Sequence, residues 1–238
     1  QSLTVVDSLV LPPEYEVEYE WLKDGFSINK SLRASPGIES KLTYSSDRKF
    51  AYSTDKSSST IRIYSVDPNT RVLSFVSSIS EGTNGIDALK GVNQLFLSPD
   101  ESFLYTISSL DDCIAWFKRN PDSGMLEFEG SVRDGVDGVD GLDGGGNYYF
   151  PPNGSTLYIV NSNENSVSWF SMDTNSGTLD FKGIIQNGVN GITGFDNPSF
   201  FQFSVDGQYA YLIGKDDNTV NCLSKDSTTG ALILKNQI

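Results

Sequence analysis

A repeat of 53 residues constrains the fold of this chain more than any other feature of its sequence. Three glycine-rich runs begin at Gly82, Gly135 and Gly188, an unbroken step of 53. The same step aligns four tyrosines, which are Tyr52, Tyr105, Tyr158 and Tyr211. A fixed period of this length is typical of repeat architectures, in which each unit is one supersecondary element that packs against its neighbours.

Each unit carries the signals of four short strands. The Asx residues Asp47, Asp100, Asn153 and Asp206 mark one turn column, since Pro/Asx/Gly clusters between apolar runs are tight-turn chemistry. In the best-formed unit we expect strands at Tyr148–Phe150, Thr156–Asn161, Ser166–Met172 and Thr178–Ile184. Apolar and polar residues alternate within them, and no segment has a sustained helical period. Four strands in a unit of this length predict an all-β fold, a β-propeller built from four-stranded blades.

The period divides the chain into residues 1–41, 42–94, 95–147, 148–200 and 201–238. We interpret the last four as blades of one propeller domain. The first 41 residues fit the period poorly, and we interpret them as a partial or divergent blade. Its expected strands are Ser8–Leu11 and Tyr15–Leu22, with a turn at Pro12 and Pro13.

Such a chain holds about 4.5 units and leaves unpaired strand edges, which tend to associate. Three arrangements would cover them. The N-terminal segment could build a divergent fifth blade, the chain could belong to a larger ring, or another chain could complete it. We favour the larger ring. Because the chain begins with Gln1 and not Met, we also expect that a leader or an upstream region has been removed.

Several motifs repeat with little change. They are the turn Leu97–Asp100, the pair Leu157-Tyr158, the strand Asn165–Phe170, the hairpin Ser176–Phe181 and the run Asp134–Gly144. Together they resemble the lactonase-type β-propeller repeat of 6-phosphogluconolactonase-like proteins, from about residue 41 to the end. The resemblance implies the propeller fold. It implies sugar-lactone hydrolysis less directly, because propellers host enzymes, lectins and scaffolds alike.

Composition removes several classes of function. There are 17 Lys+Arg against 31 Asp+Glu, a net charge of -14. This charge repels nucleic acid and anionic membranes, and it suits a cationic partner or a divalent ion. The absence of histidine excludes a Ser-His-Asp triad, a Cys-His pair and a His-ligated zinc site within this chain. No apolar run approaches the roughly 20 residues of a membrane span. Cys113 and Cys222 fall two blades apart, so we expect no disulfide between them.

The run Asp134–Gly144 offers a candidate calcium site at Asp137, Asp140 and Asp143. Calcium prefers six to eight oxygen ligands, and alternating Asp and Gly lets carboxylates and carbonyls converge. However, the run lacks the spacing of an EF-hand loop, and Lys90 replaces the last of these aspartates in the preceding run. The structural alternative is that the glycines supply positive φ angles. The apolar residues between them, Val136, Val139 and Leu142, would then fill the gap between blades.

A carbohydrate site is a second candidate, on the face where the glycine-rich runs meet the loops between second and third strands. Tyr148 and Tyr149 break the column pattern and could stack on a sugar ring, whereas Asp112, Asn165 and Asn218 could bind its hydroxyls. The alternative for the tyrosines is packing between blades. We expect Trp116 and Trp169 in the core, because Ile63 and Cys222 replace them in register.

The sequence therefore favours a non-catalytic binding or scaffold module of a secreted or surface protein. Its predicted partner is a glycan or a protein ligand at the propeller face, with no nucleic acid and no membrane insertion, and Ca²⁺ is the one predicted ion. The alternative is a sugar-lactone hydrolase that uses carboxylates, with or without a divalent cation.

Overall fold

The computed structural model describes residues 15–20, 29–34, 42–144, 146–151 and 156–238. Within these ranges the regular structure is almost entirely β-strand, with one short 3-10 turn, η1 (Thr83–Gly85). The strands form four four-stranded sheets and one two-stranded sheet. All pairs are antiparallel. This confirms the predicted all-β propeller fold.

Each four-stranded sheet is one repeat, and its strands pair in the order in which they occur. The first blade contains β3 (Thr43–Tyr44), β4 (Phe50–Asp55), β5 (Thr60–Val66) and β6 (Leu73–Ser80). The second contains β7 (Val92–Leu97), β8 (Phe103–Ser108), β9 (Cys113–Arg119) and β10 (Leu126–Arg133). The third contains β11 (Asn147–Tyr149), β12 (Thr156–Asn161), β13 (Ser166–Met172) and β14 (Leu179–Gln186). The fourth contains β15 (Pro198–Phe203), β16 (Tyr209–Gly214), β17 (Thr219–Lys225) and β18 (Leu232–Gln237).

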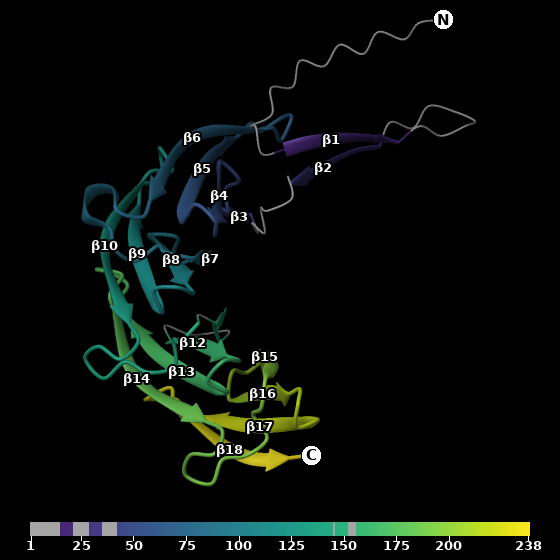
Figure 1. The fold of residues 1–238 in the computed structure, drawn as a ribbon, viewed down its shortest axis with the longest axis vertical. Coiled ribbons are helices and arrows are strands. Elements are labelled where there is room, and N and C mark those ends of the chain that lie inside the picture. Colours follow the sequence, from purple (N-terminus) through teal and green to yellow (C-terminus); the bar gives the residue numbers. More distant parts are fainter. Residues whose placement is uncertain (1–14, 21–28, 35–41, 145, 152–155) are drawn as a thin grey trace, which may run out of the picture.

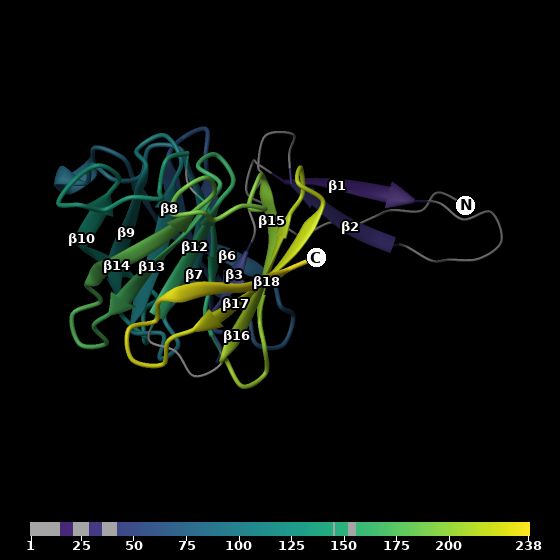
Figure 2. The ribbon, with the colours of Figure 1, turned by 90° about the horizontal axis from the view of Figure 1, so that it is seen from below.

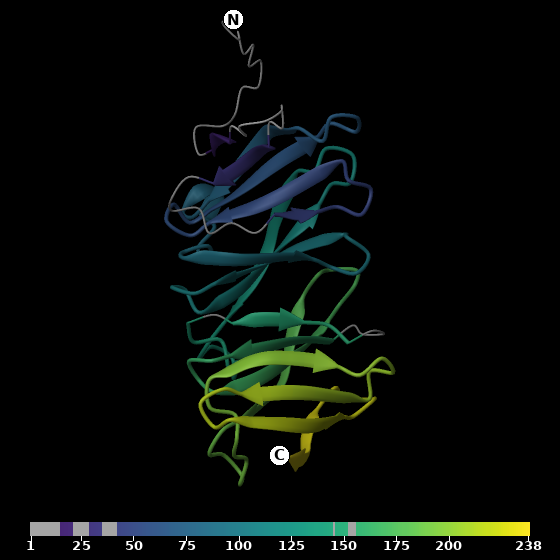
Figure 3. The ribbon, with the colours of Figure 1, turned by 90° about the vertical axis from the view of Figure 1, so that its right-hand side faces the viewer.

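The four blades follow one another along an arc. In Figure 1 the last strand of each blade lies on the convex side and the first strand lies on the concave side. Figure 3 shows the blades stacked in chain order between the two ends of the molecule. The predicted unit boundaries at 94/95, 147/148 and 200/201 fall inside β7, β11 and β15, so the second, third and fourth blades begin one to three residues earlier than the period indicates.

The N-terminal region contributes a separate hairpin, seen at one side of the blades in Figure 2. β1 (Tyr15–Glu20) covers most of the expected strand Tyr15–Leu22 and pairs with β2 (Asn29–Ala34), a strand that the sequence did not predict. The expected strand Ser8–Leu11 and the Pro12-Pro13 turn lie outside the described residues.

The hydrophobic core lies between adjacent blades. Its three large clusters each draw side chains from two consecutive sheets. At each interface a fully buried tyrosine from the second strand donates a hydrogen bond to a glycine carbonyl of the next blade. These bonds are Tyr52 to Gly124 (3.0 Å), Tyr105 to Gly177 (2.7 Å) and Tyr158 to Gly230 (2.6 Å). Because the hydroxyl is buried, the bond satisfies two polar groups that water cannot reach.

Glycine is required at the turn that receives this tyrosine. Gly177 has a φ of +73°, and a Cβ there would lie 2.5 Å from the ring of Phe103 in the preceding blade. The first blade has Arg71 at the corresponding turn position, also at positive φ but exposed to solvent. The turn therefore needs a left-handed residue in every blade, and a glycine only where another blade packs on it.

The two repeated tryptophans are buried, as predicted. Trp116 and Trp169 are each 6% exposed. Each indole ring covers a glycine on the neighbouring outer strand, Gly130 or Gly183, where a Cβ would lie 2.6 Å from the ring. Both cysteines are free, which agrees with the expected absence of a disulfide between them.

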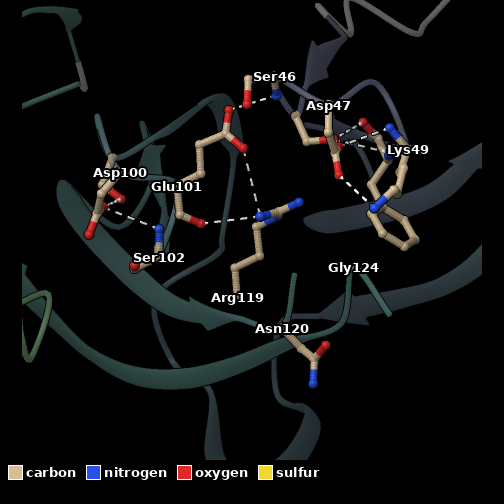
Figure 4. Close-up of polar contacts among 12 residues, drawn as sticks. Ser46, Asp47, Lys49, Asp100, Glu101, Ser102, Arg119, Asn120 and Gly124 are labelled. Carbon is tan, nitrogen blue, oxygen red and sulfur yellow. Dashed lines mark hydrogen bonds and ion pairs between the residues drawn. The ribbon is translucent and has the colours of Figure 1, made fainter. Parts of the chain in front are cut away.

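A buried arginine strengthens the interface between the first two blades. Arg119 Nε donates to the Tyr52 hydroxyl at 2.9 Å, and Nη1 donates to the Glu101 carbonyl at 3.3 Å. The Glu101 carboxylate in turn accepts the Ser46 N–H of the first blade at 2.7 Å, as Figure 4 shows. Arg119 is 6% exposed, and its hydrogen-bond partners belong to the protein itself. We therefore interpret the hydrogen bonds of Arg119 as stabilising the interface between blades and not as part of a binding site.

We predict that Tyr105→Phe lowers the free energy of unfolding by about 1–3 kcal/mol, because the variant leaves the Gly177 carbonyl buried without its donor. The matched control is Tyr211→Phe, at the same position of the fourth blade, where the side chain is 41% exposed. This control should change stability by less than about 0.5 kcal/mol. Urea denaturation of both variants measures the difference, and equal losses would contradict the role given to the buried bond.

Candidate functional site

The links between blades and the loops between second and third strands lie on one face, which we call the crossover face. The crossovers are residues 81–91, 134–146 and 187–197. The first residue of each crossover donates its N–H to the carbonyl of a hairpin loop, Ser59, Asp112 or Asn165. These bonds have distances of 3.0, 2.8 and 2.9 Å. Each crossover is thereby tied to the loop between the second and third strands of the blade that it leaves.

The glycines of the crossover 134–146 have the backbone geometry that the structural alternative predicted. Gly135, Gly138, Gly141 and Gly144 have φ angles of +72°, +81°, +94° and +74°. Val139 and Leu142 are buried, whereas Val136 is 48% exposed. Val139 and Leu142 therefore fill the gap between blades, as the alternative predicts, and Val136 does not.

Asp112 and Asn165, which the sequence predicts to bind ligand, each hold a crossover in place. Asp112 Oδ1 accepts the N–H of Gly144 at 2.7 Å, and Asn165 Oδ1 accepts the N–H of Asn197 at 2.8 Å. Both residues have left-handed φ angles, as does the exposed Asn218 at the same position of the fourth blade. Asp and Asn tolerate this conformation better than most other residues, which accounts for an Asp or Asn at this position in three of the blades.

Tyr148 and Tyr149 pack between blades. The Tyr148 ring stacks on Phe96 with centroids 4.2 Å apart, and the Tyr149 ring meets Phe201 edge-on at 5.2 Å. Both side chains are half-buried, and burial raises the pKa of each phenol. This geometry favours the packing alternative over a sugar-stacking platform.

Carboxylates gather on the crossover face in two groups that occupy the same positions of successive repeats. One oxygen from each of Asp134, Asp140 and Glu164 lies within 4.8 Å of the others. Glu81, Asp87 and Asp111 form the corresponding group 53 residues earlier.

Of the predicted calcium ligands, Asp140 belongs to the later group, and Asp137 and Asp143 do not. Both lie exposed on the crossover. Glu164 was missed because it comes from the loop between β12 and β13 and not from the glycine run. The signal that could have found it is the acidic column Asp111, Glu164 and Asp217.

The two acidic groups differ in their charge balance. In the second blade, Arg133 Nη1 lies 3.5 Å from a carboxylate oxygen of Asp111, and Nη2 lies 3.9 Å from one of Asp87. Its position in the third blade is taken by Gln186, which donates to the Glu164 carbonyl at 3.1 Å. Arg133 makes the corresponding bond to the Asp111 carbonyl at 3.0 Å. The change from Arg133 to Gln186 keeps the hydrogen bond to the loop carbonyl and removes the positive charge beside the acids.

Burial and the neighbouring negative charges change the ionisation of Glu164. Burial, and next the negative charges of Asp134 and Asp140, raise its pKa from the ordinary value of 4.5 to about 7. Asn161 Nδ2 donates to the carboxylate at 3.2 Å. The group is thus a partly buried carboxyl beside two other acids, with no ion pair to a lysine or arginine among the described residues.

The concave side carries a smaller polar group. Gln94 on β7 donates from Nε2 to the Gly146 carbonyl at 2.8 Å and to Asn147 Oδ1 at 2.9 Å, which links the first strands of the second and third blades. The neighbouring Asn93 has a buried side-chain oxygen that finds no hydrogen-bond partner within the described ranges. These amides are suited to bind hydroxyl groups.

We predict that the metal-free protein loses stability as the pH rises from about 4.5 to about 7, because the folded state binds the Glu164 proton more tightly than the unfolded state does. Glu164→Gln should flatten this part of the profile. Thermal unfolding in EDTA across that pH range measures it, with Glu127→Gln, an exposed acid on β10, as the control. Profiles of the same slope for wild type and Glu164→Gln would contradict the assignment.

Comparison with known proteins identifies a family for this chain. The family described as lactonase, seven-bladed β-propeller matches residues 41–137 and 137–237. No curated protein matches the chain.

Among solved structures, a provisionally named 6-phosphogluconolactonase of Bacteroides uniformis has a TM-score of 0.67 and 24% identity, over 83% of this chain and 53% of its own. One of Bacteroides fragilis has a TM-score of 0.64 and 22% identity, over 83% and 54%. The periplasmic gluconolactonase of Pseudomonas aeruginosa has a TM-score of 0.65 and 20% identity, over 83% and 53%.

The chain spans about half the length of these solved structures. At this identity their likeness shows the fold, and it agrees with the four consecutive antiparallel blades. The two family matches together cover nearly all of the chain beyond residue 40. The chain therefore belongs to the lactonase family of seven-bladed β-propellers.

Proposed function

We propose that this chain contributes to the hydrolysis of sugar lactones. The observation that carries the proposal is the family match from residue 41 to residue 237. The solved structures named as 6-phosphogluconolactonase and gluconolactonase support it at the level of the fold. These comparisons favour hydrolysis over the non-catalytic binding or scaffold role that the sequence alone led us to prefer.

The composition limits how such a reaction would run. Hydrolysis of a lactone adds water to the ring carbonyl, breaks the bond to the ring oxygen and returns a proton to that oxygen. Since the chain has no histidine, a carboxylate is the natural general base within it. The amides of Gln94 and Asn147 on the concave side would bind sugar hydroxyls, because they present donors and acceptors close together.

Location and partners remain proposals. We propose an extracellular or periplasmic location, supported by the acidic, serine- and asparagine-rich composition and by the periplasmic gluconolactonase among the similar structures. Within the described ranges there is no helix long and apolar enough to cross a membrane. A glycan or protein ligand at the crossover face stays a prediction.

We predict that the purified chain hydrolyses glucono-δ-lactone or its 6-phosphate faster than the spontaneous reaction, with a rate proportional to protein concentration. Gln94→Ala should lower kcat/KM by up to about tenfold, since it removes hydrogen bonds worth roughly 1 kcal/mol. A pH-stat assay measures acid release. The control is Asn175→Ala, in an exposed turn between β13 and β14.

A rate equal to the spontaneous one for both lactones, with and without added Ca²⁺ or Mg²⁺, would overturn the hydrolase proposal and return the chain to the binding role. A glycan array would then test that role. If turnover occurs but Gln94→Ala and Asn175→Ala behave alike, hydrolysis stands and the assignment of Gln94 does not.

A further inference from the structure

The acidic group of the third blade has the dimensions of a cation site. Its three ligand oxygens, from Asp134, Asp140 and Glu164, lie within 4.8 Å of one another. Oxygens within this limit can share one Ca²⁺ ion, because Ca–O distances of about 2.4 Å place two ligands up to about 4.8 Å apart. The three carboxylates are therefore close enough to bind one cation together.

The equivalent group in the second blade already holds a cation, and that cation is part of the protein. The Arg133 guanidinium faces Asp87 and Asp111 and also donates to both of their carbonyls, at 2.8 and 3.0 Å. In the third blade Gln186 takes the place of Arg133 and brings no charge. The same arrangement of acids thus contains a cation of the protein in one repeat and lacks one in the next.

A buried hydroxyl on the same side of the third blade also lacks a partner. Ser166 is fully buried, and its Oγ makes no hydrogen bond within the described part of the chain. Ser166 pairs with Asn161 across β12 and β13, so their side chains project from the same side of the sheet, where Asn161 contacts the Glu164 carboxylate at 3.2 Å.

The corresponding residue of the second blade shows how close this position lies to the acids. It is Cys113, whose thiol donates to the carbonyl of Ala88, the residue that follows Asp87, at 3.2 Å. An oxygen at this depth that makes no hydrogen bond within the protein is suited to bind a metal ion or a water on that ion.

We propose that Asp134, Asp140 and Glu164 bind one Ca²⁺ ion, which takes the role in the third blade that the Arg133 side chain has in the second. The ion would join the start of the crossover to the loop between β12 and β13, and its function is structural. This ligand set differs from the one predicted from the glycine run, and the proposal does not depend on lactone hydrolysis.

The test is calorimetric titration of EDTA-treated, dialysed protein with CaCl₂ in 150 mM NaCl, which screens non-specific attraction to a chain of net charge -14. We expect one Ca²⁺ per chain, at least tenfold weaker binding of Mg²⁺, and a melting temperature that rises with Ca²⁺ until saturation. Asp140→Asn should weaken Ca²⁺ binding at least tenfold, and it should fold normally because Asp140 is exposed. Asp137→Asn, an exposed neighbour in the same run, should change binding less than twofold.

Two reciprocal variants test the comparison between blades. Gln186→Arg should abolish Ca²⁺ binding while the protein stays folded, because it supplies the internal cation of the second blade. Arg133→Gln should add a second Ca²⁺ site at Asp87 and Asp111. Absence of Ca²⁺ binding to wild type at millimolar concentration would overturn the proposal. So would equal effects of Asp137→Asn and Asp140→Asn, or Ca²⁺ binding by folded Gln186→Arg as tight as that of wild type.

Discussion

The hydrogen bond between a buried tyrosine of one blade and a glycine carbonyl of the next is the contact on which the rest of the structure depends. It fixes how far each blade lies from its neighbour, and the apolar clusters fill the space that this distance leaves. Because the three large apolar clusters lie between blades, the contact must recur once per unit, which accounts for the strict period. The fourth blade shows the same positions where the described structure has no further blade packed on them. There Tyr209 and Tyr211 are 42% and 41% exposed, whereas Phe103 and Tyr105 at the same positions are buried.

The same constraint explains the glycine-rich crossovers. The chain must pass from the convex edge of one blade to the concave edge of the next within about a dozen residues, and short turns of this kind need left-handed residues. Gly135, Gly138, Gly141 and Gly144 supply them. Gly135 and Gly138 recur in all three crossovers, whereas Ala88 and Asn197 replace Gly141 and Gly144 once each. The recurring glycines are explained by backbone geometry and carry no information about function. A position where one repeat differs from another, such as Gln186 in place of Arg133, is more informative about function.

The period made the fold predictable. The strand order, the burial of Trp116 and Trp169, and the positive φ angles of the crossover all follow from residues that recur in register. The site was less predictable, because Asp140 meets Glu164 from a different hairpin and only the folded backbone brings the two loops together. The N-terminal strand β2 could not be found this way, since it lies outside the repeat and its pairing with β1 has no counterpart in the blades.

Two kinds of inference rest on this fold. Lactone hydrolysis is supported by family membership, whereas the cation site follows from comparing two repeats within one chain. The central claim is that a departure from the repeat marks chemistry that the fold does not require. Anomalous diffraction from crystals grown with Ca²⁺ tests that claim most directly. We expect one peak among Asp134, Asp140 and Glu164 and none beside Asp87 and Asp111, where Arg133 already lies. A peak at Asp137 and Asp143, or peaks of equal height in both blades, would contradict it.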